Sequence, residues 1–194
     1  MPGVREPRQA AQQFIQTLGS VTGCVTTQRP TVSTRTPFTP GELYTIFFPD
    51  PVSLTREDGL ASGLTLDISH VFEIVRAADP RVRWRVSTSM YEYRILDQQE
   101  TELLVWHWQP GDEWFGPDHP HIHVSATLQA RMRDGEELRA FDLDKIHVPT
   151  SRVLLEAVMR MLINEFHIRP ARANWETILE RSEAKFWDEV TRYR

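Results

Sequence analysis

The chain has little of several features that would assign it to a familiar class of protein. Its 194 residues include one cysteine, Cys24, which excludes an internal disulfide and suits a reducing compartment. No apolar run approaches the roughly 20 residues that cross a bilayer. No apolar segment follows the charged start, Met1 to Arg8, as a secretory signal requires. We therefore expect a cytoplasmic protein.

The chain also lacks an excess of positive charge. It has 22 Lys and Arg against 27 Asp and Glu, a net charge of -5. A surface that neutralises many phosphates needs the opposite balance. A P-loop, a dinucleotide-binding fingerprint and paired zinc-finger cysteines are absent from the sequence. Contact with a nucleic acid or nucleotide is therefore expected to be local, without a broad basic surface.

The composition, with 40% hydrophobic and 25% charged residues, is that of a globular protein. Together with the order of the predicted elements it indicates one α+β domain over residues 1–194. We predict a mainly antiparallel sheet with helices packed on one face, an N-terminal helix and two C-terminal helices. The predicted helices cover Glu6 to Leu18, ending at Gly19, then Arg152 to Phe166, capped by Pro149-Thr150-Ser151, and an amphipathic helix within 171–194. Residues 22–40 are rich in Thr and Pro and read as an extended segment.

Between residues 42 and 148 the pattern is mostly that of strands. Residues 68–77 fit either a strand or a helix. Tyr91, Tyr93 and Ile95 alternate in the opposite phase to Trp84 and Val86, which predicts a bulge or a bend around residues 87–89. Residues 97–100 read as the turn of a hairpin that leads into a strand at 103–108.

The most informative segment is Asp118-His119-Pro120-His121-Ile122-His123-Val124. As a strand it places Ile122 and Val124 on one face and His121 and His123 on the other. Two imidazoles at this spacing can converge on one metal ion, and zinc or manganese is the divalent metal we consider. His147 and Asp118 are the expected additional ligands. The alternative interpretation is a polar face without a metal.

The run His119-Pro120-His121-Ile122-His123-Val124-Ser125 resembles the histidine-triad motif of nucleotidyl hydrolases and transferases. That resemblance implies attack by His121 on a phosphate, with His119 and His123 in support.

A longer stretch, from about Met90 to Phe166, resembles the TumE-type component of bacterial toxin–antitoxin pairs. It contains Tyr91-Glu92-Tyr93-Arg94, a hairpin, an aromatic strand, the histidine segment and a helix after Pro149-Thr150-Ser151. The resemblance implies a small prokaryotic effector that acts on RNA or nucleotides and has an antitoxin partner. It places Tyr91, Tyr93, His121 and His123 in a catalytic site.

Two function classes remain open from the sequence. One is an enzyme, a hydrolase or nuclease that uses His121 and His123. The other is a module that binds a partner without chemistry. His70, His107 and His167 are interpreted as structural histidines.

Overall fold

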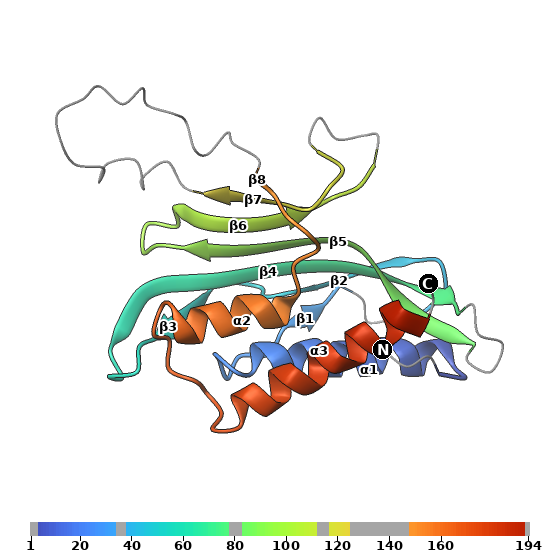
Figure 1. Ribbon diagram of the computed structural model, residues 1–194, viewed down its shortest axis with the longest axis horizontal. Coiled ribbons are helices and arrows are strands. Elements are labelled where there is room, and N and C mark those ends of the chain that lie inside the picture. Colours follow the sequence, from blue (N-terminus) through green and yellow to red (C-terminus); the bar gives the residue numbers. More distant parts are fainter. Residues whose placement is uncertain (1–3, 34–37, 78–82, 112–116, 125–147, 193–194) are drawn as a thin grey trace.

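The computed structural model is an α+β fold in which one antiparallel sheet carries helices on one face (Figure 1). It describes residues 4–33, 38–77, 83–111, 117–124 and 148–192, with side chains as far as residue 186. Helix α1 (Pro7–Thr22) precedes the sheet, and α2 (Leu155–Asn164) and α3 (Trp175–Arg192) follow it. This arrangement confirms the predicted fold class.

Eight antiparallel strands form the sheet in the part of the chain that the structure describes. Their order is β1-β2-β4-β5-β6-β7-β8, and β3 pairs with β4 outside this path. The bounds are β1 Thr31–Val32, β2 Leu43–Phe47, β3 Val52–Thr55, β4 Ala61–Arg76, β5 Trp84–Leu96, β6 Glu102–Trp108, β7 His121–Val124 and β8 Val148–Pro149. Strands β4 and β5 are the long centre of the sheet, and β6, β7 and β8 extend it on one side (Figure 1).

Strand β4 resolves the choice that the sequence left open for residues 68–77, because strand β4 continues to Arg76. Along it Leu66, Ile68, Phe72 and Ile74 are buried in alternation with less buried neighbours. A period of two places these side chains on one face, where the helices cover them.

The bulge predicted around residues 87–89 is confirmed. Val71 pairs with Met90 while the next residue, Phe72, pairs with Thr88, so Ser89 is the extra residue. An extra residue reverses the alternation of a strand. The bulge therefore keeps Thr88 and Tyr91 on the helix-covered face although they are three positions apart.

The hairpin turn after β5 is confirmed as well. Strand β5 ends at Leu96 and β6 begins at Glu102. The Asp97 carboxylate accepts hydrogen bonds from the N–H groups of Gln99 and Thr101, at 2.8 and 2.9 Å. Glu100 adopts a positive φ of 60°. Local side-chain-to-backbone bonds of this kind fix a turn from its own residues.

Helix α1 continues past Gly19, where the sequence predicted its end, and reaches Thr22. Leu18 and Val21 are both buried in the core, so packing extends the helix through the glycine. Gly23 follows as the C-cap residue. Of the predicted extended segment 22–40, Thr31–Val32 forms β1, the edge strand next to β2, and residues 34–37 lie outside the described part.

The predicted start of the next helix was wrong. Pro149 belongs to β8, and the Thr150 N–H donates to the carbonyl of Pro120 at 2.8 Å. The Val153 N–H donates to the Tyr91 hydroxyl at 3.0 Å, and α2 begins only at Leu155, without a side-chain cap. The N–H groups of Thr150 and Val153 therefore bind partners outside the helix, and α2 begins after them.

The two glycines at the end of α1 give a matched prediction. A Cβ at Gly19 meets nothing within 4 Å, whereas at Gly23 it meets the Gly19 carbonyl oxygen and the Arg172 guanidinium at 2.9 Å. We expect Gly19→Ala to raise the free energy of unfolding by about 0.5–1 kcal/mol, because alanine loses less backbone entropy in a helix. Gly23→Ala is expected to lower it. Urea unfolding measures both, and equal effects of the two changes would contradict the assigned helix end.

Among the described helices, none combines the length and the apolar character needed to cross a lipid bilayer.

Candidate metal centre

Three histidines from two neighbouring strands lie together on the sheet face opposite the helices. His107 on β6 pairs directly with His121 on β7, and His123 pairs with Val105, one step away on the same face. The alternate residues Trp106 and Ile122 belong to the core on the other face. One ring nitrogen from each of the three histidines lies within 4.8 Å of the others. We call His107, His121 and His123 the histidine cluster.

The rings of the cluster are close and mostly sheltered from solvent. The centroid of the His121 ring lies 4.9 Å from that of His123 and 5.2 Å from that of His107. His121 is buried, and His107 and His123 are half-buried. Partial burial reduces competition by water for any ion held there.

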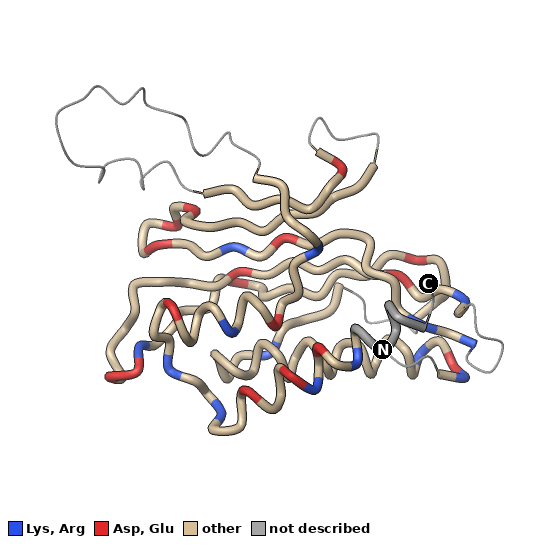
Figure 2. The backbone as a smooth tube through the Cα atoms, viewed as in Figure 1, with Lys and Arg blue, Asp and Glu red and all other residues tan. Residues whose placement is uncertain are grey.

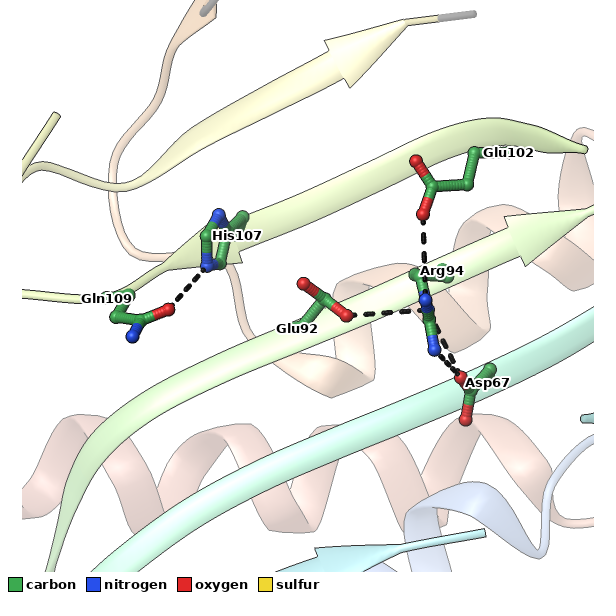
Figure 3. Close-up of polar contacts among 6 residues, drawn as sticks. All are labelled: Asp67, Glu92, Arg94, Glu102, His107 and Gln109. Atoms are coloured by element: carbon green, nitrogen blue, oxygen red, sulfur yellow. Dashed lines mark hydrogen bonds and ion pairs between the residues drawn. The ribbon is translucent and has the colours of Figure 1, made fainter. Parts of the chain in front are cut away.

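Hydrogen bonds fix which nitrogen carries the proton in two of the rings. Nδ1 of His121 lies 2.9 Å from the carbonyl oxygen of His119, which can only accept, so Nδ1 is the donor. Nε2 of His107 lies 3.3 Å from Oε1 of Gln109 and donates to it (Figure 3). In the neutral rings the lone pairs therefore lie on Nε2 of His121 and Nδ1 of His107.

This arrangement fits a divalent transition metal. A metal-binding histidine usually donates its other N–H to a carbonyl or carboxylate oxygen, which orients the ring. Tetrahedral zinc with Zn–N bonds of 2.0–2.1 Å sets its nitrogens about 3.3 Å apart, so small side-chain rotations would bring the cluster to that spacing. Three imidazoles favour zinc over manganese, which prefers carboxylate oxygens.

The other ligands expected from the sequence take different places. His147 lies outside the described residues. Asp118 does not belong to the histidine cluster; its side chain is 91% exposed and its carboxylate lies 4.0 Å from Nδ1 of His119. His107, which we interpreted as structural, is the third member instead. Its alternation with Trp106 and Trp108 on β6 was a usable signal, but only together with the β6–β7 register.

Tyr91 and Tyr93 lie on the opposite face of the sheet from the cluster. They pair with Trp108 and Trp106, whose alternate neighbour on β6 is His107. Their rings stack at 4.8 Å, and both are buried. Burial raises the pKa of both phenols above the usual value. The four residues implied by the TumE-type resemblance thus form two separate pairs, one on each face.

His70 is a buried, fully partnered core histidine. Its Nδ1 lies 2.8 Å from the Tyr93 hydroxyl, and its Nε2 lies 3.0 Å from Oγ1 of Thr88. Burial, aided by the charge of Arg152, lowers the pKa of His70 from its usual 6.5 to about 3. The ring is therefore neutral at physiological pH, and loss of solvation is the main cause.

A group of ion-paired side chains lies on the same sheet face as the histidine cluster and comes from β4, β5 and β6. Arg94 contacts Asp67, and its guanidinium lies 3.4 Å from Glu92 and 3.6 Å from Glu102 (Figure 3). Partial burial lowers the pKa of Arg94, but the hydrogen bond and charge of Asp67, with both glutamates, outweigh it and raise the pKa overall. Glu92 pairs with His107 in register, yet its carboxylate points toward Arg94 (Figure 3).

No protein-family model, curated protein or solved structure shows a significant match to this chain.

Proposed function

We propose that this protein is a metal-dependent hydrolase of phosphoesters, with zinc held by the histidine cluster. The observation that carries the proposal is the protonation pattern of the cluster. Two of its three rings already donate an N–H group to an oxygen acceptor, and one ring nitrogen from each of the three histidines lies within 4.8 Å of the others. Histidines that bind a metal usually donate their other N–H group to an oxygen in this way.

Among the described residues three histidines form the group, a number that favours catalysis over a purely structural role. Catalytic zinc has three protein ligands and a position left for water or substrate, whereas structural zinc has four. When bound, the metal supplies a Lewis acid and lowers the pKa of a bound water toward 7. The chain itself would hold the ion through His107, His121 and His123, and orient the rings through Gln109 and the His119 carbonyl.

The substrate class follows from the resemblance to TumE-type effectors. That resemblance favours RNA or a nucleotide as substrate, a cytoplasmic setting and an antitoxin partner. The charge distribution favours recognition of one phosphoester over a long phosphate backbone. Basic and acidic positions are interspersed over the elements in Figure 2, and the net charge is -5. A protein that follows an extended nucleic acid needs a continuous basic surface.

The test is metal content together with phosphoester hydrolysis. The protein is purified without a histidine tag as wild type, His121→Ala/His123→Ala and His119→Ala. We expect about one zinc ion per wild-type chain, and hydrolysis of bis(p-nitrophenyl) phosphate or a synthetic oligoribonucleotide. The double variant should lose both.

His119→Ala is the matched control, because alanine keeps the carbonyl that orients His121. It should retain zinc and activity, whereas a histidine-triad mechanism predicts lost activity. A metal-free wild type, or equal zinc loss in His119→Ala, would contradict the metal site. Bound zinc without hydrolysis of either substrate would contradict the enzyme and favour the partner-binding module.

A further inference from the structure

A cavity lies on the face of the sheet opposite the histidine cluster, between the strands and the helices. Its volume is about 220 Å³. Phe14 of α1, Tyr91 and Thr88 of β5, His70 of β4 and Ser182 of α3 line it. Drug-sized ligands occupy pockets of about 300–1,000 Å³, so this cavity suits a smaller molecule. Its walls include the edges and faces of aromatic rings, which favour a flat apolar group.

Hydroxyl groups at this cavity have hydrogens that are available to a ligand. The Tyr91 hydroxyl accepts the Val153 N–H at 3.0 Å, and no acceptor for its own hydrogen lies among the described residues. Neutral His70 has one N–H for the hydroxyls of Tyr93 and Thr88. Whichever tautomer it adopts, one of these hydroxyls receives a bond from the ring and keeps its own hydrogen for another partner. A ligand that brings acceptors would satisfy these donors.

Three cationic side chains line the same cavity, Arg85, Arg152 and Lys185, and the last two are the ones considered for a ligand. The Arg152 guanidinium lies 5.0 Å from the centre of the Trp108 ring and 5.7 Å from that of Phe186. Arg152 belongs to the connection between β8 and α2. Lys185 of α3 also lines the cavity. Neither Arg152 nor Lys185 has a carboxylate partner within the described ranges.

Glu156 is the one carboxyl group among the described residues that line this cavity, and it does not cancel those charges. Glu156 accepts a hydrogen bond from Ser182, and burial raises its pKa. Even with Glu156 ionised, Arg152 and Lys185 leave a net positive charge among the described side chains at the cavity. Arginine stacked on aromatic rings keeps its planar N–H groups for a carboxylate.

We propose that this cavity binds a small organic carboxylate that carries one flat apolar ring. The ring occupies the aromatic interior, and the carboxylate accepts from Arg152, Lys185 and the Tyr91 hydroxyl. The site is independent of the proposed metal centre, because the two lie on opposite faces of the sheet.

The experiment is an NMR titration of the ¹⁵N-labelled full chain with benzoate, compared with benzyl alcohol and acetate. We expect saturable shifts with benzoate and a Kd of about 1 mM or tighter. Benzyl alcohol lacks the charge and acetate lacks the ring, so both should bind at least about tenfold more weakly. Absence of saturation with benzoate, or equal binding of benzyl alcohol, would overturn the proposal.

Charge-removing variants locate the site. Arg152→Gln and Lys185→Gln should each weaken benzoate binding by about tenfold, as loss of a charged hydrogen bond predicts. Arg181→Gln removes an exposed cation from the same helix, away from the cavity lining, and should leave the Kd unchanged. His121→Ala/His123→Ala should also bind benzoate normally, which separates this site from the metal centre. Equal loss in Arg181→Gln would overturn the assignment to this cavity.

Discussion

Acidification is expected to destabilise this protein through His70, by about 1.4 kcal/mol for each pH unit at full effect. The folded chain keeps His70 neutral until pH about 3. The unfolded chain takes up that proton near pH 6.5. Between these values the unfolded state binds one more proton, so stability falls as the pH falls. Glu156 has the opposite effect on the pH dependence of stability. Burial raises its pKa, so on acidification the folded state takes up this proton before the unfolded state does, which stabilises the fold.

The measurement is urea unfolding of wild type and His70→Gln from pH 7 down to pH 4. At pH 7 the variant should be less stable by about 1–3 kcal/mol, because glutamine does not reproduce the bonds to Tyr93 and Thr88. The gap should shrink with acidification, since glutamine does not titrate, while the contribution of Glu156 cancels between the two proteins. His167→Asn changes an exposed histidine in a left-handed conformation, which asparagine tolerates, and serves as the control. A gap that is constant with pH would contradict the burial of a neutral His70.

Removal of one imidazole from the histidine cluster is expected to lower zinc affinity by about a hundredfold or more, and removal of its orienting partner by about tenfold. Loss of a hydrogen bond that orients a ligand typically weakens metal binding by about 10–100-fold, and loss of the ligand itself weakens it further. His121→Ala therefore has the larger effect. Gln109→Ala frees the N–H of His107 and with it the ring orientation.

Competition against a chromophoric zinc chelator measures these affinities. Gln99→Ala, in the exposed turn between β5 and β6, is the matched control for Gln109→Ala and should leave the affinity unchanged. Circular dichroism of the zinc-free proteins checks that each variant stays folded. If Gln109→Ala behaves like Gln99→Ala, the ring of His107 is not held by that bond in the metal-bound protein.

The elements that the sequence predicted correctly depend on local physics. The period-two alternation in β5, its change of phase and the Asp97 turn arise from residues close in the chain, so the bulge at Ser89 was predictable. The helix ends were not. Leu18 and Val21 pack into the core and carry α1 past Gly19, and the Tyr91 hydroxyl, 62 residues away, holds the Val153 N–H outside α2.

By itself the sequence determined the α+β class, most of the strands and the face shared by His121 and His123, because each follows from backbone periodicity and turn chemistry. Only the tertiary structure decided that His107 completes the cluster and that Tyr91 and Tyr93 lie across the sheet from it. Both outcomes depend on the register between β5, β6 and β7. A register shift of one residue would move every side chain of a strand to the other face. The correct register is selected by contacts among segments that are distant in the sequence.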